Sequence, residues 1–556
     1  MVAPGGDSPS ASSSSSHVIT NHLSSTASPM RSLSSASGGL YLSAPGKIIL
    51  FGEHAVVYGR SAIAGSIDLR TYVSLFTSAD GRIYLSLPDL QVERTWLLKD
   101  LLKAGERLAT EYPVSDDGPP SLEIIVPIAR KISGACEDQC GVQSLAVLAF
   151  WYLLIGIVQR KKEMDTLKKS NGSNGFTNSC DMEDPQTKDL LAVKVTVKFK
   201  LPACVGLGSS GAFCVCIASA LLQTAGLIPP PSIPVDDEGS LTWDEQHLDI
   251  IRKWSAAAES LIHGRASGLD AAVCTYGGVA SYKPGKRIEN LQNVPDLKVI
   301  LVNSKVERNT SRLVQTVRDR FKKFPKVIDG ILDSIDAISQ EAARILQRPT
   351  PDENGSGIVE NGGRSATLTP SFAPEVDHHN LQPVSAGGRS SSLSSYAAGG
   401  KRGSTTSAIS GTSATGDPRA NHERSELTNT FSKLNDLCRI NNQLLIALGV
   451  GHAKVDQICT LLGRYGIHPK MTGAGGGGSV FAFLKPDTSQ TVLNMIRDEL
   501  SKEGFELWLP PLGGPGVMCH MHKPDTFLNI AGSTTGSRAN TPAGSSHHST
   551  PAIRKK

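Results

Sequence analysis

Residues 205–211 read VGLGSSG, and the last six of them match the pattern G-x-G-x-x-G. Some loops with this pattern bind dinucleotides, but the pattern also arises by chance, so the flanking sequence decides its meaning. The preceding segment 193–199 (VKVTVKF) alternates apolar and polar residues strictly, which predicts a strand with one face on a core and one face in water. Strands of a dinucleotide-binding fold lie in parallel sheets covered on both sides and are apolar throughout. The dinucleotide interpretation is therefore disfavoured.

The segment after this loop begins SSGAFCVCIASALLQ and predicts a helix over 209–224. It lacks the Gly-Lys-Ser/Thr ending of a Walker phosphate loop. Ser209 and Ser210 fall in the first turn of the helix, where free N–H groups and a partial charge of about +0.5 favour an anion such as phosphate. The same residues are also typical of an ordinary serine cap after a tight glycine turn. The loop alone does not decide between these two interpretations.

Four segments of the 556-residue chain have compositions that cannot bury a core. They are the Ser-rich N-terminus 1–39, a stretch at about 165–190, a Gly/Ser/Thr-rich stretch at about 350–425 and the tail 526–556. We expect all four to be disordered. The remaining roughly 380 to 400 residues are enough for two lobes, which we place at 40–285 and 286–525.

Strand and helix patterns are intermixed in the two lobes, which predicts an α+β fold with mixed or antiparallel sheets. Two short apolar runs around a Pro-Gly turn in 40–59 predict strands, and further strands are expected at 71–79, 82–88, 193–199, 279–284, 297–304, 476–485 and 504–510. Apolar periodicity predicts helices at 141–160, 209–224, 245–262, 426–448, 453–464 and 488–503.

Charge and cysteine patterns exclude several classes of protein. The net charge of +4 is dispersed, without basic side chains interleaved with aromatic ones, so no nucleic-acid partner is expected. The longest apolar run, 145–158, is 14 residues, shorter than the ~20 needed to span a bilayer, and predicts a buried core helix. The N-terminus lacks the apolar segment of a secretory signal, so we expect a cytoplasmic protein. The ten cysteines, among them Cys136, Cys140, Cys214 and Cys216, show no paired C-x-x-C array and are expected to be buried free thiols.

Three further motifs accompany the glycine loop: APGKIILFGEHAVVYG at 44–59, HGRASGLDAAVCTYGG at 263–278 and KMTGAGGGGSVFAFL at 470–484. With these four motifs in this order, the chain resembles the GHMP small-molecule kinase superfamily over 40–349 and 426–525. The segments GEHAVVYG and VNSKVERNTSRLV make the mevalonate kinase branch the most similar. Ala266 and Glu307 stand where the family usually has proline, which affects loop rigidity rather than a reactive group.

The resemblance implies a fold and a set of site residues. It implies a two-lobed GHMP-kinase fold that binds ATP at Gly206, Leu207, Gly208, Ser209, Ser210 and Gly211, with Mg²⁺ held by Ser210 and Glu259. It implies Asp270 as the catalytic carboxylate and Lys47 as its cationic neighbour. Residues implied to bind the acceptor substrate are Glu53, His54, Ser267, Thr310, Gly473, Ala474 and Gly475.

Each of these side chains also has an ordinary structural interpretation. Glu259 lies at the edge of the apolar stripe of its helix, where most glutamates are solvated. Asp270 in a first helical turn stabilises the helix dipole, and His54 could be a core histidine with satisfied hydrogen bonds. Whether Asp270 abstracts a proton or mainly orients the hydroxyl stays open, because a neighbouring ammonium weakens a carboxylate as a base.

The function implied by the resemblance is ATP-dependent phosphorylation of the 5-hydroxyl of mevalonate, giving 5-phosphomevalonate and ADP for isoprenoid and sterol synthesis. Another GHMP acceptor, such as phosphomevalonate, galactose or homoserine, is the nearest alternative. A non-catalytic ligand sensor of the same fold is the second alternative, and the presence of Lys47, Ser210, Glu259 and Asp270 argues against it. A homodimer is compatible with the resemblance.

The composition of 351–424 generates a first prediction. Replacing this stretch with a short flexible linker should leave turnover nearly unchanged, because the segment cannot bury apolar area and loop closure costs only ~0.6 kcal/mol per doubling of length. Steady-state kinetics of the shortened and full-length proteins test this. A shortened protein that folds but loses most of its activity would show that the segment has a functional role.

Overall fold

A computed structural model describes residues 39–113, 118–134, 141–171, 192–202, 205–264, 267–307, 310–347 and 418–527. The expected disordered segments 1–39 and 526–556 lie almost entirely outside these ranges, as do most of 350–425 and part of 165–190. Three residues named above also lie outside these ranges: Cys136, Cys140 and Ala266, which stands where the family usually has proline.

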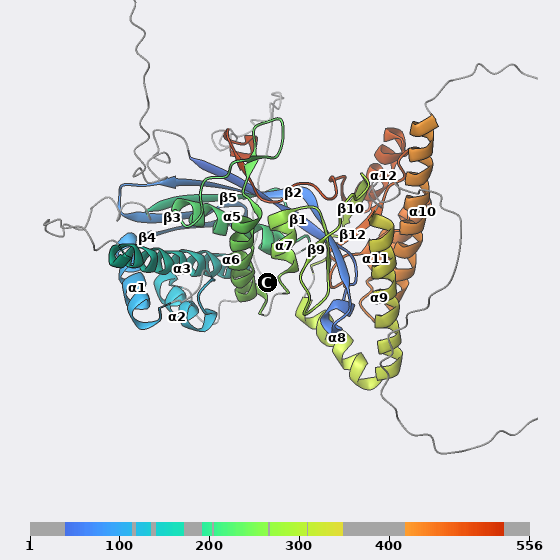
Figure 1. The fold of residues 1–556 in the computed structure, drawn as a ribbon. Coiled ribbons are helices and arrows are strands. Elements are labelled where there is room, and N and C mark those ends of the chain that lie inside the picture. Colours follow the sequence, from blue (N-terminus) through green and yellow to red (C-terminus); the bar gives the residue numbers. More distant parts are fainter. Residues whose placement is uncertain are drawn as a thin grey trace, which may run out of the picture. The chain divides into compact units, whose positions relative to one another are not determined.

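A mixed sheet of ten strands forms the larger part of the fold (Figure 1). Its main path runs β4-β3-β5-β2-β1-β14-β7-β6, and β8 and β9 extend from β2. All pairs are antiparallel except β3 with β5. The strands are β1 (Leu40–Phe51), β2 (Ala62–Thr77), β3 (Arg82–Leu87), β4 (Val92–Leu97), β5 (Val193–Phe199), β6 (Ile233–Pro234), β7 (Leu241–Thr242), β8 (Val279–Tyr282), β9 (Glu289–Asn290) and β14 (Met518–His520).

Strand β1 corrects one expectation. We expected two runs separated by a Pro-Gly turn, but the strand continues through Pro45 and Gly46. The irregularity lies in the pairing, because Pro45 pairs with Arg70 whereas Gly46 pairs with Ile67, so β2 has two extra residues at this point. A bulge of this kind accommodates a proline, which cannot donate to the ladder, without ending the strand.

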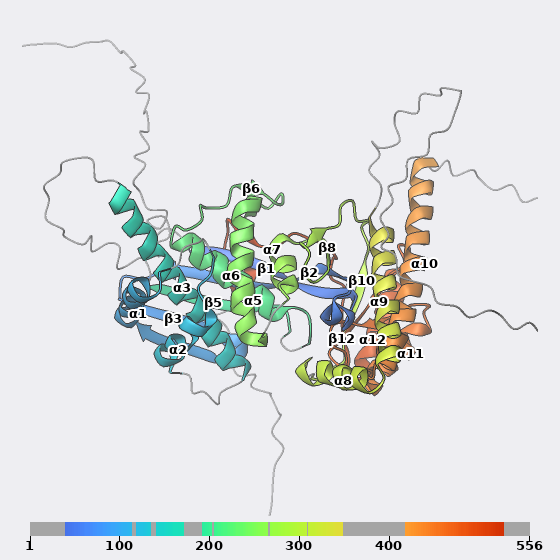
Figure 2. The ribbon, with the colours of Figure 1, turned by 60° about the horizontal axis from the view of Figure 1, so that its bottom comes forward.

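Six helices lie along one side of the larger sheet, as Figures 1 and 2 show from two directions. They are α1 (Leu98–Glu111), α2 (Leu122–Ser133), α3 (Val142–Asn171), α5 (Ser209–Thr224), α6 (Glu245–His263) and α7 (Leu269–Tyr276), with short 3-10 turns η2 (Ala55–Tyr58) and η3 (Pro88–Leu90) elsewhere. Of these, α5 packs on β1 and β2 and is buried over 211–224, which confirms the helix expected at 209–224 and explains why it is apolar all round.

The apolar segment 145–158 lies in the core. It forms part of α3, where Phe150, Trp151 and Tyr152 are fully buried, as the sequence predicts. Among the described residues, Val142–Leu167 is the single helix that is long and apolar enough to cross a membrane, but 78% of its most apolar window is buried inside the protein. A core helix passes the same test of length and composition.

A second sheet of four strands is flanked by the remaining helices (Figure 1). Its order is β11-β12-β10-β13, with β11 (Lys470–Met471), β12 (Ser479–Phe483), β10 (Val299–Asn303) and β13 (Glu506–Trp508). The helices are α8 (Thr310–Lys323), α9 (Pro325–Leu346), α10 (Pro418–Ala447), α11 (Ala453–Gly463) and α12 (Gln490–Lys502). Strand β10 is buried on both faces, because Val299 and Leu301 join the main core while Ile300 and Val302 join a second core with these helices.

The sequence analysis missed the helices at 98–111, 122–133, 310–323 and 325–346. Each of them buries only a narrow apolar stripe; in α1 the buried residues are Leu98, Leu101, Gly105 and Leu108. All four helices are more strongly amphipathic than α5, so the sequence contained a helical period at these positions that our assignment did not use.

The described cysteines are free thiols, as expected for Cys214 and Cys216. Burial raises the pKa of Cys216, Cys438 and Cys519 to about 12, so these thiols stay protonated and unreactive at neutral pH.

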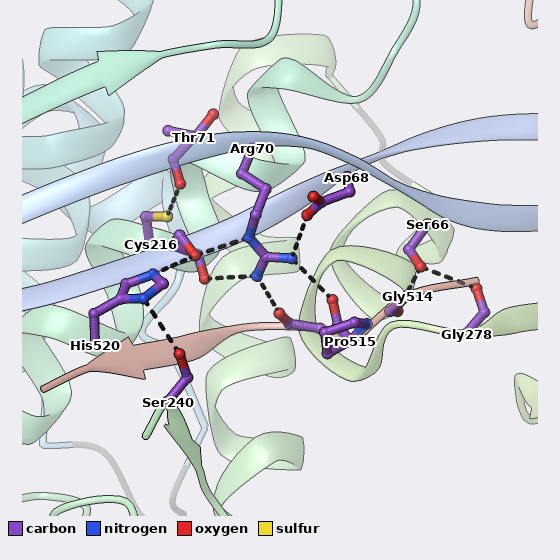
Figure 3. Close-up of polar contacts among 12 residues, drawn as sticks. Ser66, Asp68, Arg70, Thr71, Cys216, Ser240, Gly278, Gly514, Pro515 and His520 are labelled. Carbon is purple, nitrogen blue, oxygen red and sulfur yellow. Dashed lines mark hydrogen bonds and ion pairs between the residues drawn. The ribbon is translucent and has the colours of Figure 1, made fainter. Parts of the chain in front are cut away.

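The chain returns to the larger sheet near its C-terminal end. We placed 286–525 in the second lobe, but β14 pairs with β1, and Pro515 and Leu512 bridge to Gly277 and Ile67. Figure 3 shows the buried Arg70 guanidinium at this junction, where it donates to the carbonyl oxygens of Pro515 (3.1 Å) and Gly516 (2.5 Å) and to Ser43 Oγ (2.8 Å). Dividing the chain into two consecutive lobes misses this return, because the position of β14 is decided by its pairing with a strand far away in the sequence.

His520 of β14 lies beside this network (Figure 3). Its Nε2 is 2.8 Å from Ser43 Oγ, and its Nδ1 is 3.4 Å from Ser240 Oγ. Burial and the positive charge of Arg70 lower the pKa of His520 from 6.5 to about 4, against a smaller opposing effect of Asp236. The folded protein therefore holds this imidazole neutral.

The free energy of unfolding should decrease in acid because of the lowered pKa of His520. The pKa is lower in the folded than in the unfolded state, so between pH 6.5 and about 4 the unfolded state binds more protons and acid favours unfolding. The stability advantage of wild type over His520→Gln should shrink by ~2 kcal/mol from pH 7 to pH 4.5, because glutamine stays neutral. Denaturant unfolding of both proteins at several pH values measures this advantage. An advantage that does not change with pH would contradict the assignment.

Candidate active site

An ion pair joins the larger sheet to α7. Lys47 projects from β1 and Asp270 lies in the first turn of α7, and Lys47 Nζ is 3.0 Å from Asp270 Oδ1. The Lys47 side chain is 6% exposed and that of Asp270 is 25% exposed, so the ammonium is enclosed while the carboxylate can still be approached. The structure thus brings together the two residues that we expected to be neighbours.

The glycine loop lies directly against this pair. The Leu207 carbonyl oxygen accepts a hydrogen bond from the Lys47 backbone N–H at 2.8 Å, and Gly208 is the N-cap of α5. Gly208 has φ of +74°, and a Cβ there would lie 2.7 Å from Lys47 Cγ, so only glycine fits. The N-terminus of α5, with Ser209 and Ser210 in its first turn, consequently lies beside Lys47.

Glu259 is buried, not solvated. It is 2% exposed in α6, and Ser210 Oγ donates to its Oε1 at 3.4 Å, the long end of the hydrogen-bond range. Its Oε2 is buried without a hydrogen-bond partner within the described structure. Burial and the charge of Asp270 raise the pKa of Glu259 to about 8, against the opposing charge of Lys47. A cation bound beside this buried carboxylate would stabilise its ionised form.

These oxygens fit Mg²⁺. The ion prefers hard oxygen ligands and keeps several waters, so one hydroxyl and one carboxylate suffice when phosphates complete the sphere. Ser210 Oγ is a hydroxyl oxygen and Glu259 Oε2 is a carboxylate oxygen without a hydrogen-bond partner among the described residues, so both are of the type that Mg²⁺ prefers. Within the described residues, no group of three or more His, Cys, Asp or Glu side chains is arranged to hold a metal.

The sequence analysis missed His263. Its Nε2 lies 2.8 Å from Ser210 Oγ, and it stands four residues after Glu259 at the end of the same helix. This spacing places both side chains on one face of α6, a signal that the sequence contained. His263 and Glu259 together fix the Ser210 hydroxyl.

A second group of expected site residues lies where β1 ends. His54 Nε2 is 3.0 Å from the Ala474 carbonyl oxygen, so two stretches 420 positions apart meet here. Gly473 and Gly475 flank Ala474 with φ of +76° and +75°. A Cβ at Gly475 would lie 2.5 Å from the Val450 carbonyl oxygen, so this glycine permits a close backbone approach.

Glu53 is enclosed by protein groups. Its side chain is 0% exposed, and both of its oxygens have protein partners. The partners are Lys470 and the Asn441 amide, from segments far along the chain that the sequence did not connect with it. The contact with a substrate that we expected for Glu53 stays a prediction.

Ser267 and Thr310 are both exposed. Ser267 Oγ accepts a hydrogen bond from the Leu269 N–H at 3.3 Å, at the start of the helix that holds Asp270. Thr310 is the first residue of α8. Both side chains are open to a ligand, and their contact with the substrate stays a prediction.

The arrangement provides the parts that phosphoryl transfer needs. A helix N-terminus and a lysine can hold phosphate oxygens, Ser210 and Glu259 can hold a divalent cation, and Asp270 can accept a proton from a hydroxyl. Lys47, Asp270, Ser210 and Glu259 come from β1, α7, α5 and α6, which the packing of helices on the larger sheet brings together.

Comparisons with known proteins identify the family of this chain. The family model "GHMP kinases N terminal domain" matches residues 180–278, and "GHMP kinases C terminal" matches 424–502. Mevalonate kinase of Bos taurus is 34% identical over 481 residues, covering 86% of this chain and 95% of that protein, and mevalonate kinase of Homo sapiens is 31% identical, covering 86% and 95%. The crystal structure of the Methanococcus jannaschii mevalonate kinase aligns with a TM-score of 0.48 at 18% identity, over 87% of this chain and 99% of that one.

Both family models match, and the identity to these relatives extends over nearly their whole length. The lysine, the serine and the two carboxylates also lie around one helix N-terminus. The chain therefore belongs to the mevalonate kinase family of GHMP kinases.

Proposed function

We propose that this protein transfers the γ-phosphoryl group of ATP to the 5-hydroxyl of mevalonate, giving 5-phosphomevalonate and ADP. The observation that supports it most is the enclosed Lys47–Asp270 pair, which lies against the glycine loop at the start of α5. The curated relatives that cover most of this chain are mevalonate kinases. We also propose that the enzyme works in the cytoplasm, and a homodimer is compatible with this assignment.

ATP is placed at the glycine loop. We assign its phosphates to the backbone N–H groups of residues 206–211 and the N-terminus of α5, because the N–H groups and the dipole at a helix N-terminus suit an anion. Ser210 and Glu259 would hold Mg²⁺. When bound, the ion neutralises phosphate charge and orients the γ-phosphoryl group for in-line transfer.

Asp270 is assigned to the acceptor hydroxyl. In the reaction the hydroxyl oxygen bonds to the γ-phosphorus, the bond from that phosphorus to the bridging oxygen of ADP breaks, and the hydroxyl proton leaves. Asp270 Oδ2 can accept this proton, because Oδ1 is the oxygen paired with Lys47. Lys47 stabilises the carboxylate charge and the charge that develops on the transferred group. In the alternative, Asp270 orients the hydroxyl and the proton passes to a phosphate oxygen.

His54 and the loop 473–475 are assigned to the polar groups of the acceptor, with Ser267 and Thr310 nearby. His54 and Ala474 are already joined by a hydrogen bond, so the two segments are placed before a ligand arrives. A preformed site loses less entropy on binding.

The choice of acceptor is testable. The segments GEHAVV and KVERNT lead us to expect that mevalonate is turned over at least ~10³-fold more efficiently than galactose, because a site built for one set of polar groups leaves them unpaired with another. A coupled assay of ADP release with mevalonate, galactose and homoserine in parallel measures the ratio. Comparable efficiencies would exclude the mevalonate assignment while leaving the family intact.

The two carboxylates should respond differently to substitution. Asp270→Asn removes the proton acceptor, so turnover should fall by ~10²–10⁴ while ATP and mevalonate still bind. Glu259→Gln should weaken the use of Mg·ATP, and raising Mg²⁺ should restore part of the activity by mass action. Turnover is measured against Mg²⁺ concentration for both variants.

Glu245→Gln is the matched control on the same helix, since the Glu245 side chain is 77% exposed, and it should keep the Mg²⁺ dependence of the wild type. Rescue of Asp270→Asn by Mg²⁺, with no rescue of Glu259→Gln, would mean that the two roles are reversed.

A further inference from the structure

A fully buried ion pair lies behind the candidate acceptor site. Lys470 donates to Glu53, and both side chains are 0% exposed. Lys470 Nζ also donates to the Met471 carbonyl oxygen at 2.9 Å, and Asn441 Nδ2 donates to Glu53 Oε2 at 3.3 Å. Neither charge faces solvent.

Aromatic rings enclose the ammonium. Lys470 Nζ lies 5.6 Å from the ring centroid of Phe51 and 5.1 Å from that of Phe481. The rings come from β1 and β12, one strand of each sheet. Cation–π contacts of this kind add to the attraction when the cation is desolvated, and they also limit where the ammonium can lie.

The pair links the two segments that we assign to the acceptor. Glu53 precedes His54, and Lys470 stands three positions before Gly473. Two neutral links join the same segments. Thr472 Oγ1 donates to the Ile49 carbonyl oxygen at 3.0 Å and accepts from the Ile49 N–H at 2.9 Å, and His54 Nε2 lies 3.0 Å from the Ala474 carbonyl oxygen.

Stability alone does not account for a charged pair at this place. Replacing a buried ion pair with apolar residues of similar size is often neutral or stabilising, because desolvation of both charges offsets their attraction. What such a pair adds is a fixed geometry. His54, next to Glu53, has φ of +59° and ψ of −43°, a strained conformation for a non-glycine residue that persists only where its surroundings enforce it.

We propose that the Glu53–Lys470 ion pair is a positioning device for the acceptor half of the site. It holds the strained His54 backbone and the loop 473–475 in one fixed relation, so that both reach the same ligand. The proposal rests on the proposed function for the identity of that ligand, mevalonate. The ATP half of the site, around Lys47 and the glycine loop, does not depend on this pair.

The central variant carries both Glu53→Gln and Lys470→Met. It removes both charges while nearly keeping the volumes, so it leaves no unpaired buried charge and should unfold close to the wild-type temperature. Its KM for mevalonate should rise about tenfold or more, because misplaced binding groups lose productive geometry, while its KM for ATP stays within about twofold. Glu53→Gln alone is a second variant, which keeps the shape of the carboxylate and should raise the same KM.

Amide hydrogen exchange supplies a readout that does not use substrate. In both variants the amides of residues 53–56 and 471–476 should exchange at least about tenfold faster than in the wild type, because their local opening becomes easier. Leu108→Ala is the control: Leu108 is 1% exposed in α1, and its truncation leaves a cavity that destabilises the core. It should lower stability without changing either the KM for mevalonate or the exchange of these two segments.

The outcomes separate the two proposals. A double variant with wild-type exchange and a wild-type KM for mevalonate overturns the positioning role. A rise in both KM values by the same factor also overturns it, because it indicates general loosening. If the wild-type enzyme fails to phosphorylate mevalonate, the proposed function is wrong, and the exchange measurement still decides whether the pair fixes the two segments.

Discussion

The candidate site depends on the course of strand β1. This strand pairs with β2 along its length and with β14 at its start, and the backbone of Lys47 also bonds to the glycine loop. The strand passes the Pro45–Gly46 bulge without ending, so Lys47 and the segment at Gly52–His54 lie on one continuous support. The phosphate end and the acceptor end of the site are therefore held at a fixed separation by a single strand.

Two buried glutamates in this structure have opposite environments. Glu53 has a partner for each oxygen, an ammonium on one and an amide on the other. Glu259 has a distant serine on one oxygen and no partner on the second among the described groups, and the charge of Asp270 adds to the cost of ionising it. A satisfied buried carboxylate holds structure in place, whereas an unsatisfied one is suited to receive a cation. Both glutamates are buried, so burial does not distinguish the two roles. The hydrogen-bond partners of each carboxylate oxygen do.

The two ends of the site are built by different means. At the phosphate end, helices α5, α6 and α7 pack on the larger sheet and present Ser210, Glu259 and Asp270 from adjacent elements. At the acceptor end, two loops are joined by hydrogen bonds and by the Glu53–Lys470 pair. Helices position side chains through extensive packing. Loops without such packing need specific links, which the Glu53–Lys470 pair and the His54–Ala474 hydrogen bond supply at the acceptor end.

The sequence by itself determined the local elements with strong periodicity and the identity of the motifs. The alternation in 193–199 and the apolar segment 209–224 predicted β5 and α5 correctly, because side-chain period follows directly from backbone geometry. It also placed Lys47 beside Asp270 through a resemblance of motifs. Only the tertiary structure decided that β14 returns to β1, that Glu53 is enclosed by Lys470 and Asn441, and that His263 reaches Ser210. These contacts join residues tens to hundreds of positions apart and follow from how the sheets and helices pack. A local pattern such as the Glu259–His263 spacing shows which side chains share a face, but it does not record the distant partner.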